Sequence, residues 1–458
     1  MPQLTGSIVK YPARNLVVWY LVLIILGTVL LTLPICRGTD AEPISQLDAC
    51  FTATSASCVT GLAVRSTPHA FSFIGQLVIL VLIQIGGIGI MTITTYTLFN
   101  LGSKPSLRAR AILTETLGAD DDTDLKWILR HVLLVTLFSE GTGFIILLLR
   151  NAFIYDFPTA AWHALFHSIS AFCNAGFALH DDSLVRFQDD VVVNMTISAL
   201  IIVGGIGFPV LLDLNKNWRK GIFGGWEDLH VHSKFMLIGT TLLLGGGFLI
   251  FLLLEWDGVL SEMPLKDKLL VSAFHSVTCR TAGFNTIELS SLTNAMLFIS
   301  MILMLIGAGP CSTGGGFKVS TVMAMAVNAW RTFRGMTRIN FARRTIPEGV
   351  MQHAMATALL FTVIAIAALT LLLVLEQSST PHPNSQGVFL DAAFEVVSAL
   401  GTVGLSTGFT STLSTYGRMI IIALMFMGRL GPISVFVALS HTTNKTPVEY
   451  PKEEPLIG

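Results

Sequence analysis

The sequence predicts an all-α polytopic membrane protein made of four tandem repeats, each with the order helix, pore helix, loop, helix. Two observations lead to this fold class. Of the 458 residues, 52% are hydrophobic and only 12% are charged, a composition that a water-soluble domain of this length does not show. In addition, one short motif occurs four times, each time between two apolar stretches.

The repeated motif consists of a Phe, a Ser or Thr four residues later, and a single Gly at the end of the same segment. Its copies are Phe51, Ser55 and Gly61; Phe166, Ser170 and Gly176; Phe274, Thr278 and Gly283; and Phe394, Ser398 and Gly404. From Phe to Gly is ten residues in three copies and nine in the third. Because each repeat delivers one glycine-centred loop, a single chain can build a ring of backbone carbonyls around one axis. We therefore expect the repeats to surround a pseudo-fourfold central pore.

Eight apolar stretches are long enough, or nearly so, for a bilayer crossing, which takes about 20 helical residues. They are 17–33, 76–98, 128–149, 191–214, 235–254, 295–306, 354–375 and 419–439. Between the two members of each pair lies a segment too short to span, which we interpret as a re-entrant half-helix. These segments are 44–57, 159–172, 265–279 and 387–400. The resulting repeats are 1–102, 103–220, 221–345 with its second helix broken at 307–316, and 346–458 with a cytoplasmic tail.

Lysine and arginine predict the orientation of the chain in the membrane. We place 18 of the 28 on the face that carries the N-terminus and seven on the other face. The remaining three, Arg280, Lys318 and Arg429, fall inside or beside glycine-rich segments. Because cytoplasmic loops carry the excess of positive charge, we expect both termini in the cytoplasm and the glycine loops open to the outside.

Charge and cysteine content exclude several other classes. The net charge of −1 argues against a nucleic-acid partner. The first apolar run is long and lacks a small-residue cleavage site, so we expect no cleavable signal peptide. The six cysteines form no CxxC pair, and we interpret them as free thiols in packing positions. A metal ring of Cys58, Cys173 and Cys279, which each precede a loop glycine, is the less favoured alternative.

The loops that follow the half-helices are the candidate ion-binding site. They read Val59-Thr60-Gly61-Leu62, Asn174-Ala175-Gly176-Phe177, Thr281-Ala282-Gly283-Phe284 and Thr402-Val403-Gly404-Leu405. Non-helical backbone at membrane depth is tolerated only where it lines a wet cavity, and glycine permits the angles that turn carbonyls inward. The half-helix dipoles point their negative ends at this cavity, which favours a cation. The alternative is that the loops are tight turns filling a transporter core.

A second glycine cluster follows each loop, at 86–89, 204–207, 307–309 and 428–431. In the first two repeats we interpret it as close helix packing in mid-helix. In the third repeat it continues through Pro310 to Gly316. This stretch cannot be helical, because each interior Gly lowers helix stability by about 1 kcal/mol and each Pro by about 3 kcal/mol relative to Ala. We expect this loop to lie across the permeation path below the filter and to act as a gate. Its candidate residues are Gly307, Gly309, Ser312, Thr313, Gly314, Gly315, Gly316 and Lys318.

Arg429 occupies the position that Gly87 and Gly205 hold in their repeats. A guanidinium deep in an apolar helix costs a few kcal/mol unless it faces water or partners, so it is a functional candidate. It could repel the permeating ion, or donate to carbonyls of the broken loop and hold it shut; a purely structural anchor is the alternative. His167, His275 and Glu395, each directly after a repeat Phe, are expected to serve packing or hydrogen bonding. We weigh Glu140, Glu255 and Glu376 as weaker functional candidates.

These features resemble the Trk, Ktr and HKT superfamily of potassium transporters over nearly the whole chain, and the short N-terminus is most like the Ktr membrane subunits. The resemblance implies potassium uptake by a channel-like subunit, with K+ held at the filter carbonyls around Gly61, Gly176, Gly283 and Gly404. It implies that residues 307–316 form the intramembrane gate with Arg429 as its partner. A Ser replaces the first filter glycine in some sodium-permeable members, so Gly61 favours potassium, with Na+ as a coupled or second ion.

The same resemblance implies a homodimer in the cell's inner (plasma) membrane, in contact with lipid, and regulation by a KtrA-like cytoplasmic ring that binds ATP or ADP. This chain has no nucleotide-binding fingerprint and no large soluble segment, so we expect the nucleotide on the partner and no cofactor on this chain. Alternatives are an alternating-access cation symporter and a sodium-permeable cation transporter. An enzyme is not expected, because the sequence offers no paired midplane Asp, no His-Glu zinc set and no Ser with a base.

Overall fold

The computed structural model describes residues 12–39, 42–100, 125–217, 221–336, 338–342, 344–377, 381, 385 and 387–432. The segment 101–124, which contains Lys104, Arg108 and Arg110, residues 433–439 of the predicted helix 419–439 and the tail from Thr442 lie outside these ranges.

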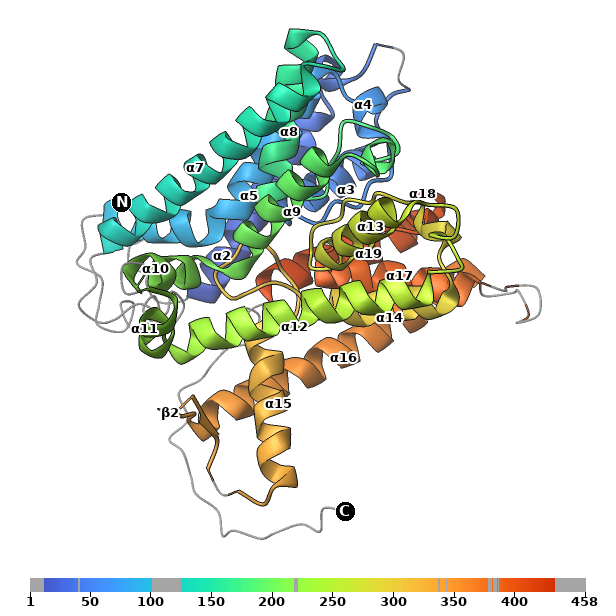
Figure 1. Ribbon diagram of the computed structural model, residues 1–458. Helices are drawn as coiled ribbons and strands as arrows, with labels where there is room; N and C mark the ends of the chain where they lie inside the picture. Colours follow the sequence, from blue (N-terminus) through green and yellow to red (C-terminus); the bar gives the residue numbers. More distant parts are fainter. Residues whose placement is uncertain are drawn as a thin grey trace.

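The first two repeats contain the expected elements in the expected order (Figure 1). The first repeat comprises α2 (Pro12–Leu31), η1 (Pro34–Cys36), α3 (Gln46–Ser57), α4 (Thr67–Ala70) and α5 (Phe73–Asn100). The second comprises α7 (Leu125–Asn151), α8 (Phe157–Phe172), η2 (Val185–Phe187), α9 (Val191–Ile206) and α10 (Phe208–Asn217). The half-helices α3 and α8 lie at the positions predicted for them.

The third and fourth repeats follow the same order, and the third adds a projecting helix and a small hairpin (Figure 1). The third comprises α11 (Gly221–Asp228), α12 (Val231–Leu254), α13 (Leu265–Thr278), η4 (Leu289–Ser291), α14 (Asn294–Leu305), α15 (Val319–Phe333), β1 (Asn340–Phe341) and β2 (Arg344–Thr345). The strands β1 and β2 pair antiparallel, with Asn340 opposite Thr345. The fourth comprises α16 (Glu348–Gln377), α17 (Val388–Gly401), α18 (Phe409–Thr412) and α19 (Thr415–Leu430). The predicted all-α membrane fold is confirmed.

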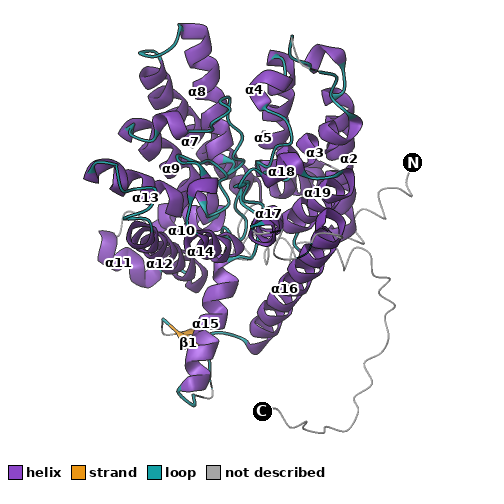
Figure 2. Cartoon of the chain, turned by 90° about the vertical axis from the view of Figure 1, so that its right-hand side faces the viewer, coloured by secondary structure: helices purple, strands orange, loops and turns teal. Residues whose placement is uncertain are grey.

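Each half-helix packs against the long helices of its own repeat, and neighbouring repeats touch in a cyclic order. Contacts between repeats join α5 to α8, α9 to α13, α14 to α17 and α19 back to α3. The last contact closes the circle, because it joins the end of the fourth repeat to the half-helix of the first. Figure 2 shows the connecting loops gathered in the middle, with helices around them.

The outer helices have the length and surface of membrane spans. Among the described residues, α2, α7, α12 and α16 are long and apolar enough to cross a membrane, and α5 and α14 contribute shorter apolar segments. Large apolar side chains face outward, for example Phe138 (77% exposed) and Leu253 (76% exposed). An apolar surface of this extent requires lipid around it.

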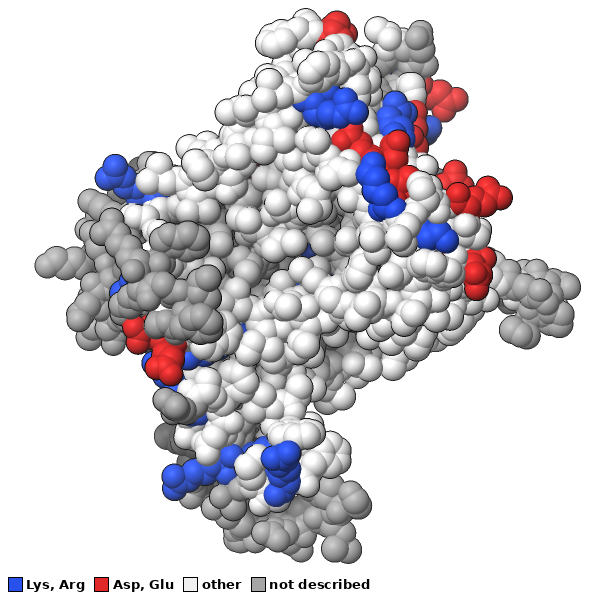
Figure 3. Space-filling view, in the orientation of Figure 1, with Lys and Arg blue, Asp and Glu red and all other residues white. Residues whose placement is uncertain are grey.

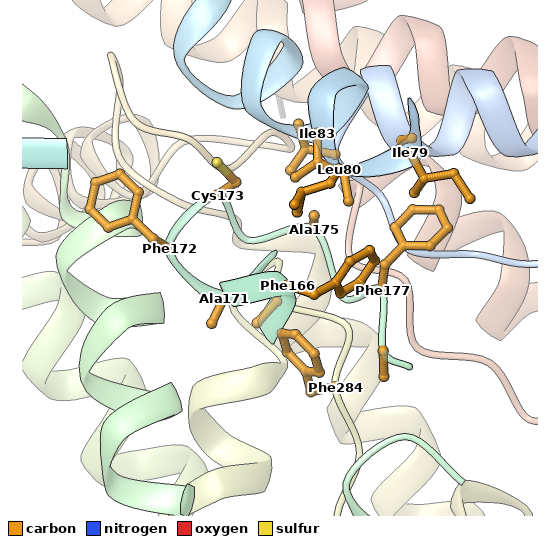
Figure 4. Close-up of a cluster of buried hydrophobic side chains, with 14 of the residues drawn as sticks. Ile79, Leu80, Ile83, Phe166, Ala171, Phe172, Cys173, Ala175, Phe177 and Phe284 are labelled. Atoms are coloured by element: carbon orange, nitrogen blue, oxygen red, sulfur yellow. The ribbon is translucent and has the colours of Figure 1, made fainter. Parts of the chain in front are cut away.

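The half-helices α3 and α8 begin at capping side chains, and each of the four half-helices buries the repeat Phe. Ser45 Oγ accepts the amide of Asp48 at 3.0 Å at the start of α3, and Asp156 Oδ2 accepts that of Thr159 at 3.5 Å at the start of α8. The repeat Phe is buried in every copy, as Phe51, Phe166, Phe274 and Phe394. Figure 4 shows Phe166 beside Phe177 and Phe284, next to Ile79 and Leu80 of α5. This packing fixes each half-helix against its neighbour.

The glycine cluster at 204–207 departs from the prediction. We expected it in mid-helix, but α9 ends at Ile206, and α9 and α10 meet at 95°. Gly207 has φ 102°, a conformation that side chains disfavour, and Pro209 follows it. The segment around Pro310 occupies the bend: Gly309 N donates to Gly205 O at 2.8 Å and Phe208 N to Cys311 O at 3.1 Å. The prediction of an uninterrupted helix over 191–214 is therefore wrong. At the bend, backbone groups of Gly205 and Phe208 bond to the broken segment of the third repeat and not to their own helix.

Gly86 should be essential for the packing of α5 on α3. A Cβ on Gly86 would come within 3.0 Å of the carbonyl oxygen of Ser57, a backbone atom that cannot move aside. We expect Gly86→Ala to destabilise the protein by about 1–3 kcal/mol, measured as a lower melting temperature in detergent. Gly141→Ala in α7 is the matched control, since nothing lies within 4 Å of its Cβ position; helix propensity should leave its stability unchanged or raised by about 1 kcal/mol. Equal melting temperatures for both variants would contradict this packing.

Candidate functional site

The structure brings the four glycine loops together into one closed ring. Each loop glycine faces the carbonyl oxygen of the residue that precedes the glycine of the next repeat. A Cβ at any of these glycines would lie within 3.0 Å of that oxygen, in the order Gly61 to Ala175, Gly176 to Ala282, Gly283 to Val403 and Gly404 back to Thr60. Real Cβ atoms do not make such contacts, so only glycine fits at these four positions.

The four loops share one backbone conformation. Gly61, Gly176, Gly283 and Gly404 have φ of 99°, 69°, 80° and 91°. Two residues earlier in each loop, a residue with a side chain also has positive φ: Val59 at 55°, Asn174 at 57°, Thr281 at 64° and Thr402 at 51°. Such a conformation costs about 1–3 kcal/mol at a residue other than glycine and is concentrated at functional sites. Its presence at the same position of all four loops indicates a shared purpose.

The Ser or Thr of the repeated motif holds the loop that follows it. Ser55 Oγ accepts the amide of Gly61 at 3.0 Å, and Ser398 Oγ accepts that of Gly404 at 3.1 Å. In the other two repeats the hydroxyl donates to a carbonyl just after the glycine, Ser170 to Phe177 at 2.8 Å and Thr278 to Phe284 at 2.5 Å. The spacing of the motif therefore has a structural cause.

The shorter third loop differs by one hydrogen bond. In the first, second and fourth repeats the residue before the glycine donates its amide to a carbonyl five residues earlier, as Thr60 does to Ser55 at 2.8 Å. In the third, Ala282 donates to Thr278, four residues earlier, at 3.0 Å. The third loop is thus one residue shorter than the other three, and its glycine still reaches the ring. Arg280, whose position the sequence left in doubt, is buried beside this loop (7% exposed).

The glycine-rich break between α14 and α15 packs directly against the ring. Gly307 N donates to Phe317 O at 2.8 Å, which pulls the two ends of the break together. A Cβ on Gly314 would come within 3.0 Å of Thr281 Oγ1, and one on Gly315 within 3.0 Å of Thr402 Oγ1. The segment also bonds to α9, through Thr313 N and Gly204 O at 3.1 Å. The predicted gate residues thus lie in contact with the predicted filter.

Two cationic side chains hold this segment through its carbonyl groups. Arg429 is 9% exposed; its guanidinium donates to the carbonyls of Thr313 and Gly86 and, at 3.2 Å, to the hydroxyl of Tyr20. Lys318 Nζ donates to Gly314 O at 2.9 Å and to Gly315 O at 3.3 Å. Of the two functional interpretations of Arg429, its geometry favours donation to the broken loop.

Tyr20 is a participant that sequence reasoning missed. It is 1% exposed, and its hydroxyl donates to Gly86 O at 3.1 Å while accepting from Arg429. The only available signal was one polar aromatic residue inside an apolar helix, and nothing near it in the sequence connects it to Arg429.

The residues that follow the repeat Phe form hydrogen bonds, as predicted. His167 Nε2 accepts the amide of Leu179 at 3.2 Å, and His275 Nε2 lies 2.9 Å from Ser300 Oγ. Glu395 accepts the amide of Thr410 at 3.0 Å. Thus a polar pore-helix position ties the half-helix to a neighbouring segment in three repeats.

The weaker carboxylate candidates have structural partners. Glu255 accepts the amide of Thr293 at 2.9 Å, and Glu376 accepts that of Ser414 at 3.1 Å; both therefore cap the helix that follows the loop. Glu140 accepts from Gln84 Nε2 at 3.0 and 3.1 Å and from Cys173 Sγ at 4.0 Å. None of the six cysteines, all of which lie in the described part of the chain, forms a disulfide.

Comparisons with known proteins place this geometry in context. The family model TrkH, described as a cation transport protein, matches residues 12–446. The chain is 37% identical to Ktr system potassium uptake protein B of Vibrio alginolyticus, over 97% of this chain and 94% of the relative. It is 37% identical to the protein of the same name from Bacillus subtilis, over 98% and 97% of the two chains. Potassium/sodium uptake protein NtpJ of Enterococcus hirae is 35% identical, again over 98% and 97%.

The fold also matches a solved structure. The crystal structure of the potassium transporter TrkH from Vibrio parahaemolyticus superimposes with a TM-score of 0.73 at 18% identity, covering 93% of this chain and 83% of that chain. At this identity the match shows a common fold.

Ser398 should contribute to stability through the loop it holds. Ser398→Ala leaves the partly buried amide of Gly404 without its acceptor, which we expect to cost about 1–3 kcal/mol, measured by thermal unfolding in detergent. Ser411→Ala in the same repeat is the control: its hydroxyl donates to Gly408 O at 2.9 Å on the exposed surface, where water replaces the bond. A loss of stability in the control as large as in Ser398→Ala would refute the special role of the motif serine.

Proposed function

Because this chain belongs to the TrkH family of cation transport proteins, we propose that it is the membrane subunit through which a potassium uptake system moves K+. The resemblance noted in the sequence, to the Trk and Ktr transporters, is confirmed by these relatives. Two of them, at 37% identity over nearly the full chain, are named as potassium uptake proteins. The potassium substrate is carried over from those names, and the closed ring of four glycine loops gives it a physical basis.

The ring carries the proposal, because it offers K+ what water otherwise provides. The backbone oxygens of Thr60, Ala175, Ala282 and Val403 each lie beside the glycine of a neighbouring repeat. Rings of carbonyls replace the hydration shell of a cation in selective filters. The half-helices α3, α8, α13 and α17 end at these loops, so their negative dipole ends add to the attraction. We assign K+ to this ring, and no bound cofactor to this chain.

The segment 307–316 is proposed as the gate. It contacts Thr281 and Thr402 of the ring, and Arg429 and Lys318 hold its carbonyls. A loop held by charge-assisted hydrogen bonds can be released by a small shift of the helix that carries Arg429, because these bonds are strong but short-ranged. Permeation would then require displacement of the segment and not opening of the whole bundle.

Partners and orientation belong to the same proposal. Relatives named after a Ktr system support a second, regulatory subunit, for which a KtrA-like cytoplasmic ring with ATP or ADP is the candidate, acting on a homodimer. In Figure 3 the charged side chains seen around α15 are Lys and Arg, whereas toward the opposite end, near α4 and α18, acidic side chains lie among Lys and Arg. This distribution supports a cytoplasmic α15 in the inner (plasma) membrane, with both termini inside.

Sodium permeation is the second candidate function. NtpJ of Enterococcus hirae, at 35% identity, is named as a potassium/sodium uptake protein. A sodium-coupled or sodium-permeable mode therefore remains part of the proposal. Alternating access is less favoured, because four loops that share one conformation and meet at one ring do not follow the inverted repeats of such transporters.

Gly404 gives the sharpest test of the filter. Gly404→Ser pushes a side chain against Thr60 O and disturbs the ring, so we expect Na+ flux to rise relative to K+ flux in liposomes. Gly408→Ser is the matched control: Gly408 lies in the same repeat with φ +97°, yet nothing lies within 4 Å of its Cβ position. The control therefore carries similar backbone strain without touching the ring. Unchanged selectivity in Gly404→Ser, or an equal change in Gly408→Ser, would contradict the filter assignment.

Arg429 tests the gate. Arg429→Ala releases Thr313 O, and we expect a higher K+ flux than in the wild type. Deleting residues 312–315 should act in the same direction, and the two changes combined should give less than the sum of their effects on the free-energy scale, since they act as one unit. Arg418→Ala, which removes an outer ion pair with Asp48 at 2.7 Å, should leave the flux unaltered. Additive effects of the first two changes would show that they work separately.

A further inference from the structure

Three histidines form a cluster directly behind the second glycine loop, and the proposed pore does not use them. His163 and His167 lie on α8, and His180 lies in the segment that leaves the loop. Their ring centroids are 5.9 Å apart for His163 and His167, 4.8 Å for His163 and His180, and 5.4 Å for His167 and His180. Imidazoles this close cannot all carry a proton without strong mutual repulsion.

His167 connects this cluster to the filter. It is 4% exposed, and its Nε2 accepts the amide of Leu179, three residues after Gly176, at 3.2 Å. A ring nitrogen accepts only while it is unprotonated, since both nitrogens of the imidazolium are donors. Protonation therefore replaces this hydrogen bond with two opposed donors at the foot of the second loop.

The fourth repeat shows that this position anchors the loop in more than one repeat. Glu395, also directly after the repeat Phe, accepts the amide of Thr410 at 3.0 Å. In both repeats the side chain after the Phe ties the half-helix to the segment leaving the filter. In the second repeat that anchor is an imidazole, so it loses its acceptor in acid.

The surroundings of the cluster contain few groups free to stabilise added protons. The ring of Tyr155, from the turn between α7 and α8, lies tilted 5.2 Å from that of His163, and Arg186 of η2 adds positive charge nearby. The acidic neighbours Asp181 and Asp182 are already engaged, Asp181 by His69 at 2.8 Å and Asp182 by Arg186 at 3.0 Å.

The other aromatic rings packed against these histidines belong to phenylalanines, which do not titrate. They are Phe166, Phe187 and Phe284. Tyr155, Arg186 and Phe187 also line a surface cavity of about 610 Å³, which brings solvent close to the cluster.

Burial first, and then the neighbouring His163 and Arg186, lower the pKa of His180 to about 4. The cluster thus stays neutral, and its hydrogen bond intact, at neutral pH. It takes up protons only as the surrounding solution becomes acidic.

We propose that the cluster of His163, His167 and His180 is a proton sensor of the second filter loop, which stops ion passage when the outer solution turns acidic. The inference rests on the proposed filter function. Protonation breaks the bond between His167 and Leu179, the loop leaves the ring, and the carbonyl of Ala175 no longer faces the ion.

The test is K+ flux into liposomes that contain the purified protein, with the outer solution varied from about pH 7 to about pH 3, a range that includes the pKa of about 4 for His180, and with the inner solution held near neutral. Wild-type flux should fall about tenfold for each pH unit below the midpoint. His167→Gln keeps an acceptor for Leu179 that does not titrate, so its flux should persist in acid. His180→Phe keeps the stacked ring and removes one titrating group, so its midpoint should shift.

His69→Gln is the matched control. His69 is an exposed histidine (77%) bonded to Asp181, outside the cluster, and its variant should show the wild-type pH profile. Acid placed only inside the liposomes should not reproduce the loss in proteins oriented with the loops outward.

Three outcomes would overturn the sensor: wild-type flux independent of outer pH, an unchanged profile in both His167→Gln and His180→Phe, or the profile of His69→Gln moving in their place. Using both cluster variants keeps the test decisive if one of them does not fold. Flux at neutral pH in the same liposomes tests the filter separately: its complete absence would count against the proposed function, whereas acid-insensitive flux would count against the sensor alone.

Discussion

The structure depends on how closely four segments of backbone approach one another. At each of the four loop glycines, the space that a Cβ would need is filled by a carbonyl oxygen of the next repeat. The ring can close only if no side chain stands there, and the positive φ of each glycine turns the chain in a way other residues resist. The half-helices, the buried Phe and the Ser or Thr below each loop all serve to bring these atoms to one place.

The same chemistry extends from the ring to the proposed gate. Backbone carbonyls that lack a helix partner require either a cation or a donor. In the ring we propose that K+ is the cation that these carbonyls bind. In the broken segment the carbonyls accept hydrogen bonds from the charged side chains of Arg429 and Lys318. The broken segment of the third repeat is therefore held by the arginine that only the fourth repeat has at this position. The bend at Gly207 gives the broken segment the space that it occupies. The chain thus departs from fourfold symmetry at the proposed gate.

Local sequence patterns sufficed for the elements and for the identity of the loop glycines. The half-helix predicted at 387–400 is observed as Val388–Gly401, and that at 159–172 as Phe157–Phe172, because apolar length, caps and glycine are local signals. The bend at Gly207 could not be found in the same way, since its cause is a segment some hundred residues away along the chain. Nor could the partners of Arg429, because Gly86 lies 343 residues from it in the sequence. The contacts of this candidate site join such distant pairs, which composition and periodicity do not encode.

The central claim is that the carbonyls of Thr60, Ala175, Ala282 and Val403 bind an alkali cation on the axis of the ring. Anomalous diffraction from crystals grown in rubidium, a heavy substitute for potassium, tests it most directly. The account predicts an anomalous peak at the centre of the ring that weakens when potassium is added and persists when sodium is added. A ring that stays empty in rubidium, with the peak elsewhere in the protein, would contradict the account.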